Sequence, residues 1–290
     1  MYDNVFKDYP GMAEASRHEM FIKMHSLENH FVIFDRRESD FSLSTERITQ
    51  ICDSRRGVGG EQLLTIEKPR SADAHAAMRI FNIDGEEVGA CGNATRCVGH
   101  LLLQETGKSE LKIETKAGTL TCRKERMGQI SVALGPISSR WTDIPLAKPV
   151  DTHHLPIANG PLTDGIALSI GNPHVVFFVP QLDRVDIARY APLVQNASLF
   201  PVGVNVGVAE VVDDHTLRLL VWERPGILTK ACGTGACVAA FAAIMRGHLK
   251  PTTITVRVPA GELAVQITEG SMAILAGPVA ISFRGTIEIP

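Results

Sequence analysis

Two short segments of the chain are near copies of each other, and each is built around a cysteine. The first is ACGNATRC at residues 90–97, and the second is ACGTGAC at residues 231–237. Their lead cysteines, Cys91 and Cys232, lie 141 positions apart, about half of the 290-residue chain. A motif repeated at this spacing predicts two similar halves, each contributing one cysteine to a shared site at their junction.

Each cysteine opens a predicted helix. Small residues come first and an apolar stretch follows, over residues 91–104 and 232–246. Both stretches carry little charge, which is typical of a helix buried on every side. A helix N-terminus presents unpaired N–H groups and partial positive charge, and this shifts a cysteine toward thiolate. The sequence therefore predicts two reactive thiols at the N-termini of two buried helices.

Most of the remaining chain reads as short strands separated by turn residues. Many of these segments are rich in Val, Ile, Thr and Phe, which suit a pleated, half-buried surface. Weaker helix patterns cover residues 44–53 and 182–191. We expect strands at residues 31–35, 63–66, 78–81, 111–114, 120–123, 130–133, 166–170, 175–179, 204–208, 217–221, 253–258, 263–267, 272–275 and 280–287.

The chain length favours two domains. We expect an N-terminal lobe over residues 21–140 and a C-terminal lobe over residues 141–278, with the proline-bearing stretch 141–156 as the linker. The last segment, 279–290, is expected to pair back with the N-terminal lobe. Residues 1–20 read as a loosely docked extension, because they mix charged residues and lack the apolar core of a signal peptide.

Charge and hydropathy narrow the range of partners. The 29 basic and 32 acidic residues give a net charge of −3, which offers no electrostatic basis for binding nucleic acid or an anionic membrane. No apolar stretch reaches the roughly 18 residues that suggest a membrane span. We therefore expect a cytoplasmic protein that acts on a small molecule, and a homodimer is compatible with the sequence.

Six cysteines are present, and four of them are expected to be packing residues: Cys52, Cys97, Cys122 and Cys237. The spacings within the two motifs, C-x5-C and C-x4-C, differ from those of structural zinc sites. The chain has no C-x-x-C motif, and a disulfide framework is not expected in a cytosolic chain of this size. We therefore expect no metal site.

The two lead cysteines suit the inversion of a stereocentre. Each is followed by a glycine, which lets a ligand approach the backbone, and then by Asn93 or Thr234, which can bind an anion. A carboxylate between the two helix N-termini would place its α-carbon between two sulfurs. A thiolate on one face and a thiol on the other can remove one proton and return another without a cofactor. The alternative is a coincidence of two small-residue helix starts.

Further motifs, in order along the chain, make the sequence similar to the diaminopimelate epimerase family. They are KMH at 23–25, NHFV at 29–32, QLL at 62–64, RIFN at 79–82, DG at 84–85, GNPH at 171–174, VNV at 204–206 and VWER at 221–224. The resemblance spans nearly the whole chain after residue 20. It implies an α+β fold of two pseudo-symmetric lobes, each a curved mixed sheet or barrel around a central helix.

The resemblance also implies an activity and a set of roles. The activity is the cofactor-independent interconversion of LL- and meso-diaminopimelate, on the lysine and peptidoglycan pathway, with Cys91 and Cys232 as bases. His174 and Glu223 would tune the thiols. The residues expected around the α-carboxylate and amine are Gly92, Asn93, Gly233 and Thr234. Those expected at the distal end are Asn29, Asn82, Asn172, Asn205, Glu223 and Arg224, with Gln62 nearby.

The chain departs from the family pattern in two loops. SLEN at residues 26–29 stands where the family often shows GLGN, and Leu228 replaces an acid in the loop before the second cysteine. We expect these departures to bear on substrate identity more than on reaction type. Two alternatives therefore stay open: a racemase for another amino acid, and a thiol-based metal or redox protein, which rests only on the cysteine count.

Overall fold

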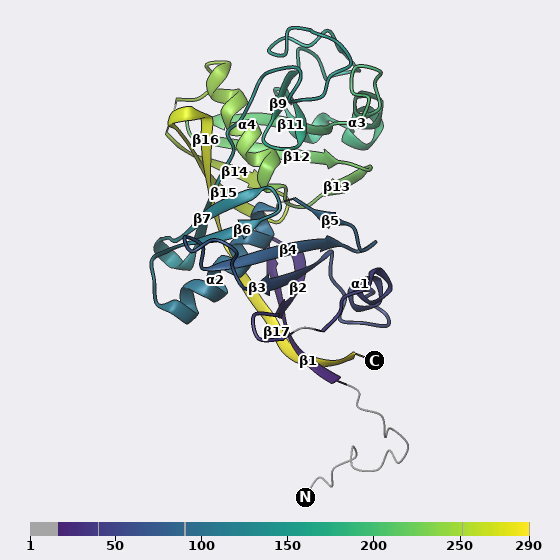
Figure 1. Ribbon diagram of the computed structural model, residues 1–290. Coiled ribbons are helices and arrows are strands. Elements are labelled where there is room, and N and C mark those ends of the chain that lie inside the picture. The colour runs from purple at the N-terminus through teal and green to yellow at the C-terminus, as the bar shows by residue number, and fades with distance from the viewer. Residues whose placement is uncertain (1–16, 40, 90, 251, 290) are drawn as a thin grey trace, which may run out of the picture.

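The computed structural model describes residues 17–39, 41–89, 91–250 and 252–289. Figure 1 shows two lobes stacked along the long axis of the molecule. The lower lobe contains β1 (Arg17–Ser26), β2 (Asn29–Asp35), α1 (Thr45–Cys52), β3 (Gln62–Glu67), β4 (Ala76–Asn82), β5 (Glu87–Val88), α2 (Gly92–Thr106), β6 (Glu110–Thr115), β7 (Gly118–Lys124), a 3-10 turn (Arg126–Gly128), β8 (Ile130–Leu134) and the last strand, β17 (Ala280–Ile289).

The upper lobe is built from the second half of the chain. It contains β9 (Ile166–Ser169), β10 (Pro173–Phe178), a 3-10 turn (Leu182–Arg184), α3 (Ile187–Gln195), β11 (Asn205–Asp213), β12 (Thr216–Glu223), β13 (Ile227–Thr229), α4 (Gly233–Met245), β14 (Thr253–Val258), β15 (Gly261–Thr268), a second 3-10 turn (Glu269–Ser271) and β16 (Met272–Gly277).

The two lobes repeat one order of strand pairings. From β1 to β8, neighbouring strands pair antiparallel, parallel, antiparallel, parallel, antiparallel and antiparallel, with β5 as a short side branch on β4. The series from β9 to β16 is identical, with β13 as the side branch on β12. The sequence repeat is therefore also a repeat of topology.

Each cysteine helix lies inside the curve of its own sheet. Helix α2 contacts β1, β2, β4, β6, β7 and β8, and α4 contacts β9 to β12 and β14 to β16. The two helices also contact each other, and their buried residues belong to one apolar cluster. This confirms the predicted α+β fold of two pseudo-symmetric lobes, each a curved mixed sheet around a central helix.

Two strand pairings join the halves of the chain. Strand β8 pairs antiparallel with β16, from Ile130↔Gly277 to Leu134↔Ala273. Strand β17 pairs antiparallel with β1 along its length, so the end of the chain lies in the sheet of the first lobe. Residues 17–20 therefore belong to a strand and not to the expected extension, whose other residues, 1–16, lie outside the described residues.

Most predicted elements are present, and one helix is displaced. The expected helix at 182–191 is a 3-10 turn at Leu182–Arg184, followed by α3 from Ile187. The reason is local: the Asp186 side chain accepts from the Arg189 N–H and caps a helix that begins there. Strands β1, β5 and β13 were not predicted.

The expected linker, residues 141–156, packs against the upper lobe. No helix or strand lies between β8 and β9. Ile144, Leu146 and Leu155 of this connection are nevertheless buried in a second apolar cluster with β10, β11 and α3. The segment therefore packs onto the upper lobe. Within the described residues, no helix has the length and apolar character needed to span a bilayer.

Candidate active site

The N-termini of the two cysteine helices meet at the junction of the lobes. A Cβ added to Gly92 would lie 3.3 Å from Leu275 Cδ2, and one added to Gly233 would lie 2.8 Å from the same atom. The Gly233 position would also be 3.3 Å from Asn93 Oδ1. The first turns of α2 and α4 therefore lie side by side, where side chains at the two glycines would collide with their surroundings.

Both cysteines are N-cap residues in extended conformation. Cys91 has φ −146° and ψ 117°, and Cys232 has φ −122° and ψ 108°. The Gly235 N–H donates to Cys232 Sγ at 3.3 Å, so this thiol takes the place of a capping side chain. Cys91 is half-buried and Cys232 is buried, and both are free thiols. Each sulfur therefore lies at the positive end of a helix.

The thiols differ in their neighbours. Burial raises the pKa of Cys232 well above its ordinary value, and the Glu223 carboxylate raises it further through its charge and a hydrogen bond. Burial also raises the pKa of Cys91, but the N–H groups of Ala94 and Asn93 lower it. The same Glu223 charge acts on Cys91, so this carboxylate faces both thiols. Burial raises its own pKa.

A buried polar chain supports Cys232. Thr234 Oγ1 lies 3.5 Å from Cys232 Sγ and 3.1 Å from His174 Nε2. The imidazole nitrogen also lies 3.2 Å from Asn172 Oδ1 and 3.4 Å from Asn205 Nδ2. Burial, with the charge of nearby Arg224, lowers the pKa of His174 to about 3. The ring is therefore neutral near pH 7, and it contacts the thiol through Thr234.

Arg224 follows the end of β12 and retains free donors. Its backbone N–H donates to Asn205 Oδ1 at 2.9 Å, and Nη1 donates to the Val202 carbonyl at 3.1 Å. Among the described residues, no carboxylate pairs with this guanidinium, whose pKa is lowered by burial. It can therefore receive an external carboxylate in a bidentate contact.

The lower lobe contributes amide groups. Asn93 Nδ2 donates to Asn29 Oδ1 at 3.2 Å, and Asn29 in turn donates to Glu61. Gln62 Nε2 donates to Asn82 Oδ1 at 3.0 Å at the paired ends of β3 and β4. In the described part of the chain, no hydrogen bond joins this second pair to the groups around the thiols. The structure thus brings together the predicted residues near the cysteines, and it leaves Gln62 and Asn82 as a separate pair.

Sequence reasoning missed Glu61 and Arg96. The charge of Glu61 contributes to the raised pKa of Glu223, which places it near the junction. Arg96 is fully buried in α2 and donates from Nη2 to Asn93 Oδ1 at 2.6 Å. Arg96 is the one charged residue near the start of a helix predicted to be buried. A charged residue at a buried position is uncommon, so the sequence could have marked it as a candidate.

The altered loop at residues 26–29 reaches across the junction. Leu27 and Glu28 form the turn between β1 and β2, with φ of 50° and 62°. Leu27 is buried, and its Cδ2 would lie 2.8 Å from a Cβ on Gly261 of the upper lobe. Glu28 forms an ion pair with Lys230, two residues before Cys232. Leu27 matches the family pattern, whereas Glu28 departs from it, so the ion pair with Lys230 is the contact between the lobes that comes from the departure.

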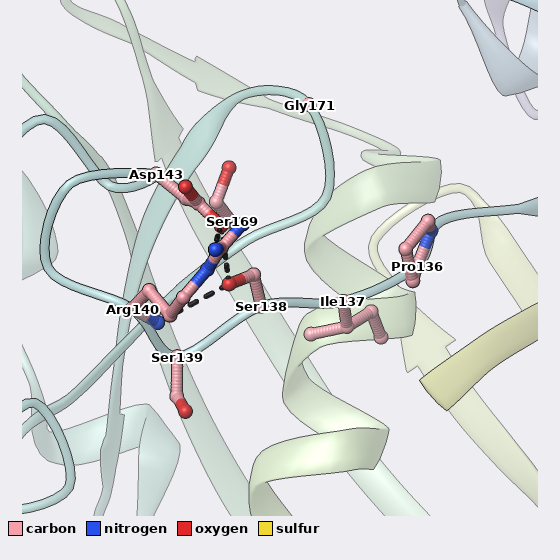
Figure 2. A pocket seen from close by; sticks show the side chains of 8 residues that line it. All are labelled: Pro136, Ile137, Ser138, Ser139, Arg140, Asp143, Ser169 and Gly171. Carbon is pink, nitrogen blue, oxygen red and sulfur yellow. Dashed lines mark hydrogen bonds and ion pairs between the residues drawn. The ribbon is translucent and has the colours of Figure 1, made fainter. Parts of the chain in front are cut away.

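A separate hollow of about 580 Å³ lies beside the connection between the lobes. Figure 2 shows the eight residues that line it: Pro136, Ile137, Ser138, Ser139, Arg140, Asp143, Ser169 and Gly171. Ser138 Oγ and Arg140 Nε both donate to Asp143 Oδ2, at 2.6 and 2.9 Å. The side chains of Ser138, Arg140 and Asp143 thus satisfy one another, and no cysteine lines the hollow, so the helix N-termini are the better candidate.

Solved structures share this fold. A phenazine biosynthesis protein of the PhzF family from Bacillus anthracis superposes with a TM-score of 0.68 at 18% identity, covering 94% of this chain and 100% of that one. A hydroxyproline epimerase from Agrobacterium vitis gives 0.65 at 16% identity, over 94% and 93%. The class is therefore the two-lobed fold common to PhzF-type proteins and amino-acid racemases and epimerases.

Sequence comparison narrows this class to one family. The chain matches the family described as diaminopimelate epimerase over residues 21–139 and 166–281, a match that omits only the connection between the lobes and the ends. The diaminopimelate epimerase of Phenylobacterium zucineum is 44% identical over 93% of this chain and 97% of its own. That of Sphingopyxis alaskensis is 43% identical over 93% and 97%. The chain belongs to the diaminopimelate epimerase family and is an isomerase.

Proposed function

We propose that the protein interconverts LL- and meso-2,6-diaminopimelate, with Cys91 and Cys232 as bases on opposite faces of the α-carbon. The observation that carries this proposal is the convergence of the two helix N-termini, where Gly92 and Gly233 face the same Leu275 side chain. A carboxylate bound between them would be surrounded by N–H groups from both lobes. The adjacent α-carbon would then meet one sulfur from each lobe.

The proton transfer follows from this placement. One thiolate takes the α-proton, and the opposite thiol delivers its own proton to the other face. Negative charge that develops at the α-carbon spreads into the carboxylate, where the N–H groups around Asn93 and Thr234 stabilise it. The reverse reaction uses the same groups with their roles exchanged. The pair titrates as one coupled system.

Glu223 and His174 act on Cys232 in this scheme. The Glu223 carboxylate accepts a hydrogen bond from the Cys232 thiol, which favours the protonated sulfur as the acid of the resting state. His174 touches no sulfur directly and holds the Thr234 hydroxyl 3.5 Å from it. His174 is therefore a positioning residue, and Glu223 also offers an acceptor for a substrate ammonium.

Recognition of the distal amino-acid group falls to the rim of the site. Diaminopimelate carries a second carboxylate, which suits the free donors of Arg224. Asn205 fixes the Arg224 backbone, and Asn172 lies 3.4 Å from Thr234. Asn29, Asn82 and Gln62 supply amide donors and acceptors from the lower lobe. A substrate held by both lobes would be closed off from water.

The wider assignment follows from the same activity. We place the enzyme, acting without a cofactor, in the synthesis of lysine and of peptidoglycan precursors. Cytoplasmic location and a homodimer remain predictions. Domain boundaries at residues 140 and 278 also remain predictions, with the lower lobe beginning in β1 and completed by β17.

The test is a substrate comparison with purified, fully reduced protein and no added cofactor. LL- and meso-diaminopimelate are each incubated beside a panel of single-headed amino acids that includes proline, hydroxyproline, lysine and glutamate. We expect a kcat/KM for diaminopimelate at least about 100-fold above that for any other substrate. A substrate with only one amino-acid group would leave the polar groups of the distal subsite without a partner. A preference for another amino acid would support the racemase alternative, which the Glu28 and Leu228 departures motivate.

A further inference from the structure

Arg96 carries a buried charge that no acidic group of the described residues balances. Arg96 is 0% exposed and lies close to the start of α2. Nη2 donates to Asn93 Oδ1 at 2.6 Å and to Ser26 Oγ at 2.7 Å. Within the described residues, Nε and Nη1 have no hydrogen-bond partner, and no carboxylate lies within ion-pair distance. Burying a guanidinium in this way is costly unless an anion compensates it.

The fold makes room for this charge at the joint between the lobes. A Cβ on Gly277, the last residue of β16, would lie 2.3 Å from Arg96 Nη1. Ser26, which accepts from Arg96, also donates to the Pro278 carbonyl at 3.0 Å. The guanidinium therefore lies between α2 and the ends of β1 and β16, directly behind the helix N-termini.

The ionisable groups that face Arg96 are thiols from three elements: Cys91 and Cys97 of α2 and its N-cap, Cys122 of β7, and Cys237 of α4. Three of these are fully buried core cysteines. Cys91 is the half-buried one, and it lies at the open end of the helix. The N-terminus of α2 is therefore the place where an anion that balances Arg96 can form, as the Cys91 thiolate, or bind from outside.

We propose that Arg96 is a positioning residue of the Cys91 half-site, which orients the Asn93 amide and reserves a buried positive charge for the anion at this helix N-terminus. That anion is the Cys91 thiolate or the α-carboxylate of an amino-acid substrate. The substrate part of this inference rests on the proposed function, whereas the thiolate part does not.

The orientation of Asn93 follows from the chemistry of arginine. A guanidinium has donors and no acceptor, so the Asn93 atom 2.6 Å from it must be the amide oxygen. The amide nitrogen then points the other way, toward Asn29 Oδ1 at 3.2 Å. Arg96 thereby fixes which face of the amide a ligand meets. Without it, the two orientations of Asn93 would compete.

The upper lobe has no arginine at the equivalent position of its cysteine helix. Counted from Gly92 and Gly233, the first residues of the two helices, the position of Arg96 is occupied in α4 by Cys237. Cys232 instead has the Glu223 carboxylate beside it. Glu223 faces Cys91 as well and opposes Arg96 there. Arg96 offsets part of this effect at Cys91, whereas Cys232 has no such cation among the described residues and also bonds Glu223, so the thiolate is less disfavoured at Cys91 than at Cys232.

Site-resolved alkylation of the substrate-free protein tests the charge. Iodoacetamide labelling of Cys91 is followed by mass spectrometry from pH 7 to 11 in wild type, Arg96→Gln, Arg96→Lys and the control Arg246→Gln. Arg246 is the C-cap residue of α4, and it pairs with Asp164 at the end of the helix opposite to Cys232. We expect the Cys91 midpoint to rise by about one pH unit in Arg96→Gln. Arg96→Lys and Arg246→Gln should keep the wild-type midpoint.

Steady-state kinetics of the same variants test the orientation of Asn93. Lysine keeps the charge but cannot hold Ser26 and Asn93 with a fixed fork, so Arg96→Lys should raise KM about tenfold with a smaller change in kcat. A folded Arg96→Gln with the wild-type Cys91 midpoint, or Arg96→Lys with the wild-type KM, overturns the proposal. If Arg96→Gln does not fold, an Arg96→Lys midpoint that rises overturns it. Labelling requires no substrate, so a raised Cys91 midpoint in Arg96→Gln, together with a wild type that does not epimerise diaminopimelate, would count against the proposed function alone.

Discussion

The two reactive thiols share a position in the fold and differ in the charges around them. Each caps a buried helix, where N–H groups and the helix dipole favour thiolate. Burial opposes this and raises the pKa of both. Glu223 adds to the effect at Cys232 through a direct hydrogen bond. We expect the enzyme to rest with its available proton on Cys232.

Replacing either thiol should abolish epimerisation. We expect Cys91→Ala and Cys232→Ala each to lower kcat for both isomers at least about 10³-fold, because neither face can be served by the other sulfur. The assay is interconversion of LL- and meso-diaminopimelate. Cys52→Ala, at a buried cysteine of α1 outside the junction, is the matched control and should change stability only. An active, folded single variant would contradict the two-base scheme.

His174 should make stability depend on pH. Burial lowers its pKa to about 3, whereas the unfolded chain binds the proton near the ordinary value of 6.5. Between these values the unfolded state holds more protons, so the free energy of unfolding falls as pH falls, by at most about 1.4 kcal/mol per pH unit. Urea unfolding at pH 7.5 and 5 should show a smaller loss for His174→Gln than for wild type. Equal losses would refute a buried neutral histidine.

At the residue scale, only some residues of the candidate site could be predicted from the sequence. The cysteines and their glycines stand out because a repeated motif marks them, and motif resemblance adds Glu223, Arg224 and the asparagines. Arg96 could not be assigned a role from sequence, because its role depends on burial without a counter-ion. Both are properties of the fold. Glu61 could not be predicted, because it belongs to the lower lobe and acts on Glu223 of the upper lobe, and the sequence does not show that the two are close.

Single elements were predictable where their residues decide them. Periodic, β-branched segments such as β14 and β15 were located correctly because their patterns are strong. Strands β5 and β13 have two and three residues and owe their form to pairing with β4 and β12. Strand β1 mixes charged and apolar residues without a regular alternation, and it is held as a strand by pairing with β2 and β17. Pairing partners, not local propensity, determine these three.

The turn between β1 and β2 holds two ordinary residues in the left-handed region. Such conformations cost about 1 to 2 kcal/mol per residue and are usual for glycine or asparagine. Leu27 is buried and contributes packing, whereas the Glu28 ion pair with Lys230 is exposed and contributes little. We expect Glu28→Gly to stabilise the protein by about 0.5 to 1 kcal/mol in urea unfolding. Glu28→Gln, which keeps the backbone cost, should be near neutral; equal effects would contradict this.

At the scale of the whole molecule, one core joins the two lobes. Helices α2 and α4 share an apolar cluster, and β8 pairs with β16 across the junction. This arrangement couples the unfolding of one half to that of the other. It also fixes the two helix N-termini against each other, which a two-thiol site requires. Sequence predicted the two lobes, but their shared core is visible only in the structure.

Truncation of β17 tests this coupling. Trp141 and Trp222 lie in the connection and in β12, so tryptophan fluorescence reports on the upper lobe, while β17 pairs with β1 of the lower lobe. Deleting residues 280–290 should lower the thermal midpoint seen by fluorescence together with the one seen by circular dichroism. The full-length chain should show a single coincident transition. A fluorescence midpoint unchanged by the deletion would show that the lobes unfold independently.

The most direct measurement of the two-base claim is the fate of the α-hydrogen in heavy water. LL-diaminopimelate is converted to a few per cent in deuterated buffer, and product and recovered substrate are analysed by NMR. Since the acid is a second thiol that has exchanged with solvent, the meso product should carry one α-deuterium while the recovered LL substrate stays protiated. Deuterium entering the recovered substrate as fast as the product, or protium retained in the product, would contradict two thiols acting on opposite faces.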